Sequence, residues 1–507
     1  MIKYVFHLIL IFLSIQLKSQ NFTYYVTGKS DDSFTKALED SKNYYLLGHQ
    51  NYDRLNTKPF ILKLDKDGNK LEEHHFDTLG IYTIFNDICW APDSTFIVAG
   101  SNRVDSTSNY VPIVLKIDKE FNILWMKKYK ATRNENYFFR LRLKNDSSGY
   151  ILCGNSNNRI QDEYLGIVAD INLQGDTNTF KEFFWGNIFA FVFDIIETFD
   201  GNYLLITNDA IFPWIPPFSG NNKLIKLNSK FEVDTAVDLG SQGIPLSNKI
   251  GMSNNCKMEW LDSNQLMIQG VVNNLNDSNP LDDDRDLGIV LFNYAELNTD
   301  TTHAYGNMEL WDQSSLYGLS FKDTSNIYTC VTHNFDWPHL FPSSFKSEFF
   351  VVKTNSKGIS KWEKRFSNGA HTLCYGILAT SDGGALIYGS SYLYGYNGNE
   401  ERDAYLIKIG SNGESQIRPA SIEEQNGIGS MHIYPNPSNG DLIVESSDNV
   451  ILHIYDLNAS LIFKKEVMKG INQFSLPLSI PDGMYISQFS NNKGWVSRKL
   501  IVKRSKF

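Results

Sequence analysis

Short apolar runs separated by polar turns recur along the first four-fifths of the chain. Seven of these runs are preceded by an Asp that is followed by Ser, Thr or Gly: Asp40-Ser41, Asp93-Ser94, Asp146-Ser147, Asp200-Gly201, Asp262-Ser263, Asp323-Thr324 and Asp382-Gly383. By subtraction, successive Asp residues are 53, 53, 54, 62, 61 and 59 positions apart. A repeat of this period is typical of an array of similar units rather than of one mixed core.

Residues 85–130 show the pattern within one repeat. Strand-like runs rich in β-branched and aromatic residues cover 85–90, 96–100, 113–117 and 123–129. Ala91-Pro92-Asp93-Ser94 is a turn between the first two runs, because Pro presets φ and Asp hydrogen-bonds its own backbone. The second and third runs recur in all seven repeats. Each repeat is therefore predicted to form one four-stranded antiparallel sheet.

The two ends of the repeat region complement each other. The last repeat has a third strand near Ile409 and no convincing fourth strand after Gly413, whereas a spare strand-like run, residues 22–26, precedes the first repeat. We predict an all-β protein in which the N-terminal strand completes the last sheet of a seven-bladed β-propeller over residues 20–416. The alternatives are a β-helix, whose repeats are shorter, and an array of β-sandwiches.

The first 19 residues read as a secretory signal peptide. Lys3 supplies the positive start, residues 4–17 are mostly apolar, and Ser19 is a small residue before Gln20. The alternative is an N-terminal membrane anchor, but a bilayer span needs roughly 20 apolar residues. No later stretch is long and apolar enough to be expected to cross a membrane, so we expect no transmembrane span.

Net charge and cysteine spacing argue against a nucleic-acid partner, a zinc site and a disulfide framework. The formal net charge of −10 argues against a nucleic-acid partner. The five cysteines lie in separate strand-like runs and have no zinc-ligand spacing: Cys89, Cys153, Cys256, Cys330 and Cys374. We expect them to be small buried hydrophobic residues, and a disulfide framework is not expected.

The pattern changes after a polar segment, residues 417–430, which reads as a linker. Over residues 431–507, seven short strand-like runs alternate with turns at a spacing of about ten residues. This spacing predicts a small β-sandwich of immunoglobulin-like build.

The same segment resembles the type A C-terminal sorting domain of the type IX secretion system of Bacteroidetes. The resemblance is carried by five stretches: Tyr434-Pro435-Asn436-Pro437-Ser438-Asn439-Gly440, Ile454-Tyr455-Asp456-Leu457-Asn458, Gly470-Ile471-Asn472, Gly483-Met484-Tyr485-Ile486 and Lys499-Leu500-Ile501-Val502. The chain departs from the family at Ala459, where the family has Gly, and Ala tolerates positive φ poorly.

The resemblance implies that type IX secretion machinery is a partner. It also implies export to the extracellular space or the outer cell surface, with removal of the tail. The alternative, a carbohydrate-binding sandwich, would be expected to show a row of exposed aromatic residues, which the tail lacks. The resemblance covers about one-seventh of the chain and does not concern the activity of the propeller.

Long connections between second and third strands are where binding is expected. We predict about 10–17 residues in each, on one face of the propeller, opposite to tight, repetitive hairpins. Three of these loops carry aromatic candidates for binding a glycan or a protein: Trp214, Phe218, Trp337, Phe341, Tyr392, Tyr394 and Tyr396. The alternative is that these rings pack against the blades themselves.

A second candidate site is the central channel. The positions six residues before each turn Asp are Phe34, Asp87, Arg140, Asp194, Cys256, Tyr317 and Gly376. If these strands line the channel, Asp87, Arg140 and Asp194 are neighbours there, either as an acid–base or polar-ligand site or as structural ion pairs.

The sequence offers one candidate metal-binding loop and none of three common catalytic motifs. Asp282, Asp283 and Asp284 lie in an acidic loop that offers oxygen ligands for Ca²⁺, although the spacing is not that of an EF-hand and a solvated loop is the alternative. No GxSxG, HExxH or P-loop pattern occurs. We therefore predict a secreted, non-catalytic binding or scaffold module, with a polysaccharide hydrolase or lyase that uses channel carboxylates as the alternative.

Overall fold

The computed structural model describes the chain in segments. They are residues 21–27, 30–53, 56–130, 132–158, 163–183, 191–208, 222–239, 250–251, 256–273, 285–306, 312–335, 347–392, 402–415, 431–436, 438–456, 461–491 and 494–504. The secondary structure of these segments is strand and turn, without a helix. The chain divides into two compact units, residues 1–417 and 418–507.

In the larger unit, consecutive strands pair into four-stranded antiparallel sheets, the blades. Blade 1 is β2(Asp31–Glu39), β3(Asn43–Asp53), β4(Asn56–Asp65) and β5(Lys70–His75). Blade 2 is β6(Tyr82–Trp90), β7(Phe96–Arg103), β8(Val111–Ile117) and β9(Ile123–Lys128). Blade 3 is β10(Glu135–Leu143), β11(Gly149–Asn158), β12(Glu163–Asn172) and β13(Thr177–Phe183). Blade 4 is β14(Phe191–Glu197), β15(Tyr203–Asn208), β16(Asn222–Leu227) and β17(Val233–Asp238).

The pattern continues through three further blades. In blade 5, β18(Ile250–Gly251) and β19(Lys257–Trp260) share the first-strand place before β20(Gln265–Asn273), β21(Arg285–Asn293) and β22(Asn298–Tyr305). Blade 6 is β23(Gln313–Phe321), β24(Ile327–His333), β25(Glu348–Thr354) and β26(Ser360–Phe366). Blade 7 is β27(His371–Ala379), β28(Ala385–Tyr392), β29(Arg402–Ile409) and β1(Phe22–Val26).

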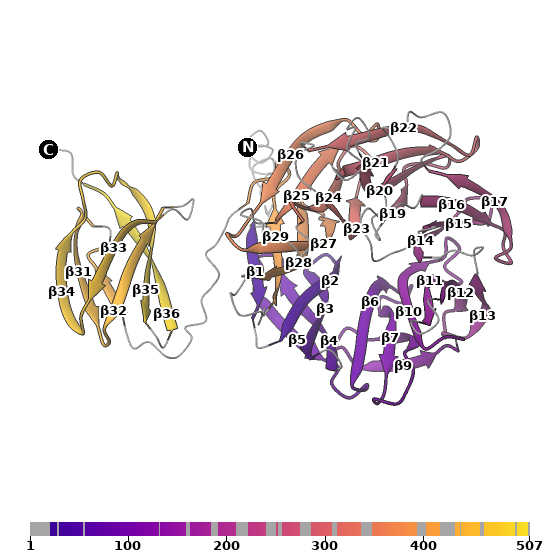
Figure 1. The fold of residues 1–507 in the computed structure, drawn as a ribbon, viewed down its shortest axis with the longest axis horizontal. Helices are drawn as coiled ribbons and strands as arrows, with labels where there is room; N and C mark the ends of the chain where they lie inside the picture. The colour runs from indigo at the N-terminus through magenta and orange to yellow at the C-terminus, as the bar shows by residue number, and fades with distance from the viewer. Residues whose placement is uncertain are drawn as a thin grey trace, which may run out of the picture. The chain divides into compact units, whose positions relative to one another are not determined.

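The chain ends of the propeller meet in blade 7, as predicted. β1 pairs antiparallel with β29 along its whole length, with Tyr24 opposite Leu406. Figure 1 shows the blades following one another around an axis, with the first strand of each blade innermost. The prediction of a seven-bladed β-propeller is confirmed by this pairing.

The core of the propeller lies between blades. Each apolar cluster takes residues from at least two neighbouring sheets, because a single sheet cannot bury both of its faces alone. One cluster joins Leu47 and Ile61 of blade 1 to Ile88 and Phe96 of blade 2. Another packs Phe22 of β1 with Phe34 of blade 1, and so joins the last blade to the first. The ring is therefore closed by side chains as well as by strand pairing.

The hairpin between the third and fourth strands repeats one backbone feature. One residue of each hairpin has positive φ, and in blade 3 it is Gly175 at φ 78°. A Cβ on Gly175 would lie 2.7 Å from the Trp125 ring, which belongs to the outer strand of blade 2. In blade 2 the same hairpin position is Phe121, whose buried side chain packs in the core between blades 1 and 2. Glycine is thus required where the preceding blade presses against the hairpin.

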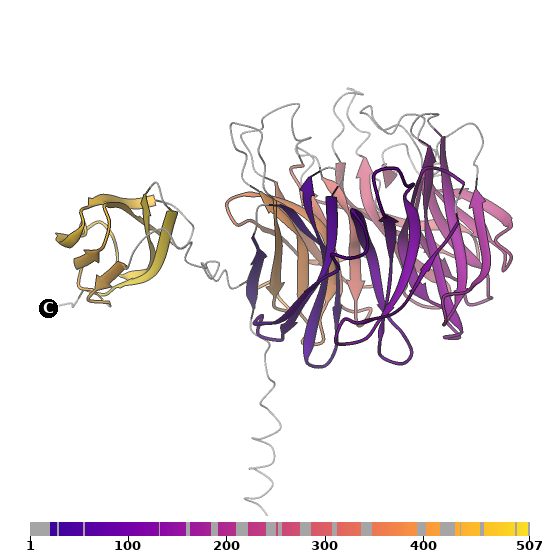
Figure 2. The same ribbon diagram turned by 90° about the horizontal axis from the view of Figure 1, so that it is seen from below.

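The lengths predicted for the second-to-third connections are wrong in several blades. By subtraction of strand ends, the connection has two residues in blade 1 and four in blade 3. The strands continue through polar positions, so that Gln50 pairs with Lys58 and Asn155 with Gly166. Backbone pairing does not need apolar side chains, and the end of an apolar run therefore underestimates the strand. Figure 2 shows the blades from the side, with their strands running along the axis.

The smaller unit is a β-sandwich. One sheet contains β30(Met431–Tyr434), β31(Asp441–Ser446) and β34(Gly470–Ser475). The other contains β33(Leu461–Val467), β32(Val450–Tyr455), β35(Gly483–Asn491) and β36(Gly494–Val502), in that spatial order. Leu442 and Val444 of the first sheet share one buried core with Leu452, Phe489 and Leu500 of the second. The exact domain limits and the immunoglobulin-like build remain predictions.

Candidate functional site

Seven equivalent positions follow one another on the inner strands of the propeller. Each position lies three residues before the last paired residue of its first strand. The residues are Lys36, Asp87, Arg140, Asp194, Lys257, Gly318 and Gly376. Charges of both signs therefore alternate through blades 1 to 5 of the ring.

Counting back six residues from the turn Asp finds only part of this ring. It places Asp87, Arg140 and Asp194 correctly, and the structure brings these three residues together as expected. It misses Lys36 and Lys257, because the Asp takes different places in different turns. Asp40 directly follows the last paired residue of its strand, whereas Asp93 follows three residues after it. Counting from the end of the strand is the signal that finds both lysines.

The two channel carboxylates hold backbone N–H groups of the next blade. The N–H of Leu141 donates to Asp87 Oδ2 at 2.9 Å, and the N–H of Met258 donates to Asp194 Oδ2 at 2.8 Å. The register of the first strand slips just before Asp87 and just before Asp194, in blades 2 and 4. Both side chains are buried. Each carboxylate therefore links its own blade to the following one through a charge-assisted hydrogen bond.

Two arginines neutralise Asp194. Arg142 Nη2 lies 2.8 Å from Asp194 Oδ2, and Arg140 Nε lies 3.7 Å from Asp194 Oδ1. Arg142 also contacts Glu259 at 3.2 Å, and Lys257 contacts the same carboxylate at 3.0 Å. Burial raises the pKa of Glu259, but Arg142 and Lys257 outweigh burial and lower that pKa to about 2. The result is an ion network across blades 3, 4 and 5, in which Arg140, Asp194 and Lys257 are buried and Arg142 and Glu259 are half-buried.

Tyr317 of blade 6 occupies the space inside the ring. Its side chain is 1% exposed, and its hydroxyl lies 2.8 Å from the backbone oxygen of Asn86 and 3.0 Å from that of Phe139. Lys36 Nζ lies 3.7 Å from the centre of the ring. Burial raises the pKa of Tyr317 well above its ordinary value, so the hydroxyl stays protonated and donates. One side chain thus ties blade 6 to blades 2 and 3 across the axis.

The geometry favours the structural interpretation of the channel charges. Asp194 is 0% exposed, and its oxygens accept from Met258 N–H, from Ile195 N–H and from Arg142. Asp87 is 3% exposed and accepts from the N–H groups of Ile88 and Leu141. General acid–base work needs a carboxylate within reach of a substrate proton. Neither carboxylate offers an open oxygen of that kind among the described residues.

A row of aromatic rings joins blades 2 and 3 at the second-to-third connection of blade 2. Ring centres are 4.9 Å apart for Tyr82 and Tyr110, 5.6 Å for Tyr110 and Tyr137, and 6.0 Å for Tyr137 and Phe139. All four residues are half-buried. The guanidinium of Arg103 lies 5.1 Å from the centre of the Tyr110 ring. The repeat pattern does not predict this row, because its members come from two strands and a loop that are far apart in sequence.

One of the predicted rim aromatics falls in the described residues, and it is not a rim residue. Tyr392 ends β28, is 3% exposed and stacks on His371 at 5.3 Å between ring centres. It packs within blade 7 instead of presenting a ring to a ligand. The other candidates lie outside the described residues: Trp214, Phe218, Trp337, Phe341, Tyr394 and Tyr396. The acidic candidates Asp282, Asp283 and Asp284 also lie outside them.

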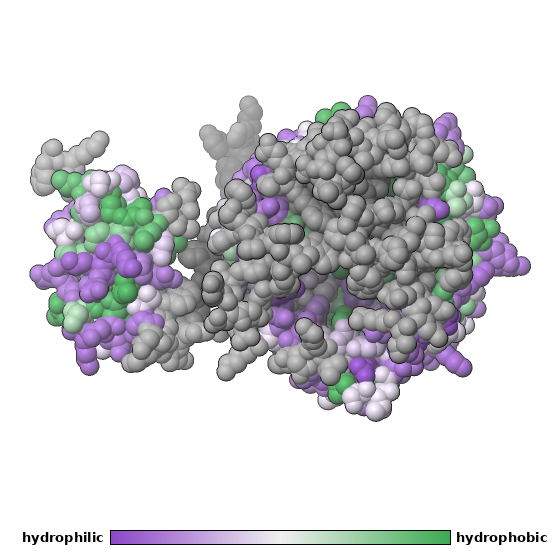
Figure 3. Space-filling model, in the orientation of Figure 1, coloured by the Kyte–Doolittle hydropathy of each residue, from purple (hydrophilic) through white to green (hydrophobic). Residues whose placement is uncertain are grey.

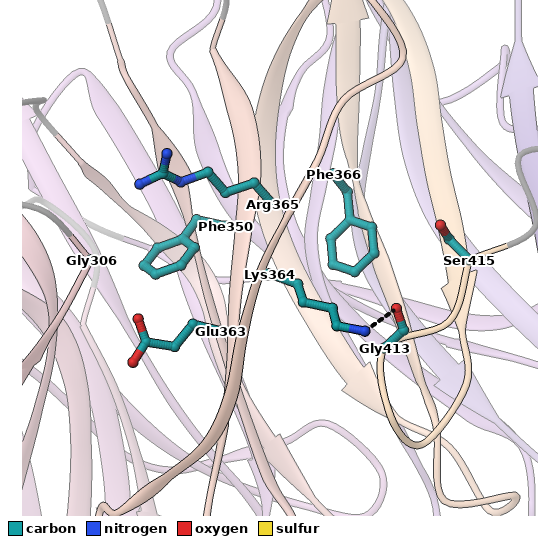
Figure 4. A pocket seen from close by; sticks show the side chains of 8 residues that line it. All are labelled: Gly306, Phe350, Glu363, Lys364, Arg365, Phe366, Gly413 and Ser415. Atoms are coloured by element: carbon teal, nitrogen blue, oxygen red, sulfur yellow. Dashed lines mark hydrogen bonds between the residues drawn. The ribbon is translucent and has the colours of Figure 1, made fainter. Parts of the chain in front are cut away.

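A groove of about 710 Å³ runs along the outer strand of blade 6. Figure 4 shows Glu363 and Arg365 on the same side of β26 as Phe350, whereas Lys364 points to the hairpin of blade 7 and lies 3.2 Å from Gly413 O. A smaller groove of about 330 Å³ occupies the same place on blade 2, against Gly175. The groove therefore arises from the repeat itself. Figure 3 shows hydrophilic residues around much of the coloured outer edge of the propeller.

Two further findings concern the described residues only. No group of three or more His, Cys, Asp or Glu side chains among them is placed to hold a metal ion. In the same part of the chain, no helical segment has the length and apolar character that a bilayer span requires.

The sorting-motif residues have structural roles in the sandwich. Asn436 Oδ1 accepts a hydrogen bond from Ile501 N–H at 2.8 Å. Gly440 has φ 108°, and a Cβ there would lie 3.0 Å from Arg504 Nε. Gly483 begins β35, and the buried Tyr485 donates to Pro481 O at 2.6 Å. The remaining members are Tyr434, which ends β30, Pro435, which follows it, Lys499 in β36, and Pro437, which lies outside the described residues.

Residues 432–503 match the family model of the secretion system C-terminal sorting domain. This match confirms the resemblance found in the sequence. A sorting domain of this kind directs its protein to the cell surface or the extracellular space, so the propeller is exported cargo. The match implies an interaction between the tail and type IX secretion machinery.

Comparisons of the whole chain concern the fold. The Pyrococcus horikoshii acylaminoacyl peptidase has 8% identity, with 82% of this chain and 57% of that chain covered and a TM-score of 0.42. The β-propeller domain of the Trilobed protease from Pyrococcus furiosus has 9% identity, 73% and 95% coverage and a TM-score of 0.39. A polysaccharide lyase, an ulvan lyase, has 9% identity, 76% and 96% coverage and a TM-score of 0.45.

This chain thus spans little more than half of the acylaminoacyl peptidase. No curated protein matches the sequence.

Proposed function

We propose that the exported propeller is a non-catalytic binding module, which recognises a glycan or a protein surface through the face that carries the second-to-third connections. Its mature form acts outside the cell, at the surface or in the medium. The tail serves export and takes no part in recognition.

The aromatic row of Tyr82, Tyr110, Tyr137 and Phe139 is the observation that supports this proposal. Half-buried rings spaced 4.9 to 6.0 Å apart offer flat apolar surface, and the tyrosine hydroxyls add polar groups beside it. Such surfaces stack on sugar rings and anchor protein interfaces. Three of the four rings, Tyr82, Tyr137 and Phe139, lie on strands of blades 2 and 3, which lowers the entropic cost of binding.

The lengths of the connections also favour this face as the binding face. By subtraction of strand ends, the second-to-third connections range from two residues in blade 1 to fourteen in blade 6. The first-to-second turn has five residues in blade 2 and five in blade 6, so the opposite face varies less. Variable connections on a constant scaffold are typical of binding faces. The sequence candidates Trp214 and Trp337 belong to two of the longer connections.

The alternative, a polysaccharide hydrolase or lyase that uses Asp87 and Asp194, receives no support from the channel. Both carboxylates are buried and accept backbone hydrogen bonds that hold neighbouring blades. Their geometry supports a stabilising role.

The test is retention of the isolated propeller, residues 20–416, on an array of glycans and surface proteins. The proposal expects selective retention of a small set of ligands, with no product released from a panel of polysaccharides. Absence of retention across a broad array, or release of oligosaccharide that is lost in Asp87→Asn, would contradict it.

A further inference from the structure

Two of the five cysteines meet at the interface of blades 6 and 7. The sulfur of Cys374 in β27 lies 3.3 Å from the sulfur of Cys330 in β24. Both side chains are buried, and both belong to the same apolar cluster. Cys89, Cys153 and Cys256 have no cysteine neighbour of this kind among the described residues, so they serve as internal controls.

The backbone around this pair is held in place. Cys374 N–H donates to Thr332 Oγ1 of blade 6 at 2.8 Å, and Ser315 Oγ of blade 6 donates to Cys374 O at 2.7 Å. A disulfide needs a sulfur–sulfur distance of about 2.0 Å, so the sulfurs have to approach by about 1.3 Å. Rotation about the Cα–Cβ bond of either cysteine moves its sulfur by more than this distance.

We propose that Cys330 and Cys374 form a disulfide in the exported protein, which bridges blades 6 and 7. Export takes the chain out of the reducing cytosol, into compartments where disulfides persist. The sequence alone does not predict this pair, because Cys330 and Cys374 are 44 positions apart and share no motif.

The oxidant belongs to the class of disulfide-bonded thiol oxidants. The Cys330 thiolate attacks the oxidant's disulfide, which forms a mixed disulfide and releases one oxidant thiolate. The Cys374 thiolate then attacks the Cys330 sulfur and displaces the second oxidant thiolate. Two protein thiols are oxidised, the oxidant's disulfide is reduced, and the two protons pass to its thiols. Burial raises the pKa of the Cys330 thiol in the folded protein, so the reaction belongs to the chain before blades 6 and 7 pack.

The bridge would link blade 7, which contains both ends of the propeller chain, to blade 6. β1 completes blade 7, and β27 of the same blade lies beside β23 of blade 6. The disulfide would link this interface between blades 6 and 7 covalently. A disulfide stabilises mainly by restricting the unfolded chain.

The experiment uses full-length protein from the culture medium, collected into N-ethylmaleimide, then denatured and digested with trypsin without reduction. The proposal expects mass spectrometry to find tryptic peptides 323–346 and 366–402 linked, and three of the five cysteines alkylated. Reduction should lower the thermal midpoint by roughly 5 °C. Cys153→Ala should keep this shift, and Cys374→Ala should lose it. Alkylation of all five cysteines in the secreted protein would overturn the proposal, even if Cys374→Ala fails to fold.

Discussion

The guanidinium group of Arg140 lies over the ring of Tyr317, 4.1 Å from its centre. The two residues come from blades 3 and 6, on opposite sides of the axis, and both are buried. Arg140 Nη2 also donates to the backbone oxygen of Leu316, next to the tyrosine. Contacts across the axis therefore add to the contacts between neighbouring blades, and the centre of the propeller is a structural hub.

Loss of the Tyr317 hydroxyl should weaken this hub. Tyr317→Phe leaves the backbone oxygens of Asn86 and Phe139 without their buried donor. We expect the free energy of unfolding to fall by about 1–3 kcal/mol. Denaturant unfolding of the propeller measures the change. Tyr294→Phe removes a hydroxyl that hydrogen-bonds Asp200 at the surface, and it is the matched control, with a much smaller expected effect. Equal effects of the two variants would argue against the hub.

Neutralisation of Asp194 should destabilise the propeller through its neighbours. Asp194→Asn removes the ion pair of the buried Arg140, leaves the half-buried Arg142 with only Glu259 as a counter-charge, and weakens the acceptor of Met258 N–H. We expect a loss of about 3–5 kcal/mol in the free energy of unfolding. Asp176→Asn makes the same substitution at an exposed ion pair with Lys127, and it should leave stability nearly unchanged. A stable Asp194→Asn protein that has lost a measurable activity would instead favour the catalytic interpretation.

Lys36 should make stability depend on pH. Its side chain is 16% exposed, and burial lowers its pKa to about 7, although Asp87 at 3.6 Å acts in the opposite direction. Between pH 7 and the ordinary lysine value the unfolded chain binds more protons, so stability from this group rises with pH above 7 and is lowest below it. From pH 7 to 9, the increase in the free energy of unfolding should be smaller in Lys36→Met than in the wild type, by at most about 1.4 kcal/mol per pH unit. Urea unfolding at several pH values tests this. Lys127→Met, at an exposed lysine, should keep the wild-type profile.

Removal of residues 431–507 should stop export. The deleted segment contains the sorting domain, whereas the larger unit has its own closed set of cores. We expect the truncated propeller to accumulate folded inside the cell envelope, as measured by fractionation and immunoblotting. The converse fusion, residues 417–507 on a fluorescent protein behind the native signal segment, should reach the surface or the medium. Normal secretion of the truncated chain would refute this role of the tail.

The sequence predicts the ring far better than the site. Repeat spacing locates all seven blades, and the spare strand at 22–26 predicts that the N-terminus completes the last blade, because a four-stranded repeat leaves one place empty. Periodicity also finds Asp87, Arg140 and Asp194. It does not find Lys36, since the short turn at Asp40 shifts the count.

Contacts across the axis could not be predicted from the repeat. Tyr317 reaches two blades that are about 180 and 230 residues away in the chain, and a local pattern carries no information about such distances. The aromatic row and the Cys330–Cys374 pair are missed for the same reason. Tyr392 was wrongly assigned to the rim, because the apolar run of β28 continues through Ser390 and Ser391 to the tyrosine.

Recognition by the loop-bearing face is tested most directly by one measurement. The affinity of the propeller for a ligand retained on the array is measured by calorimetry for Tyr110→Ala and for Phe199→Ala. Phe199 is an aromatic residue that is 59% exposed in a first-to-second turn, on the opposite face. We predict at least about tenfold weaker binding for Tyr110→Ala, which corresponds to about 1.4 kcal/mol, and unchanged binding for Phe199→Ala. Unchanged binding for Tyr110→Ala together with weaker binding for Phe199→Ala would contradict the account.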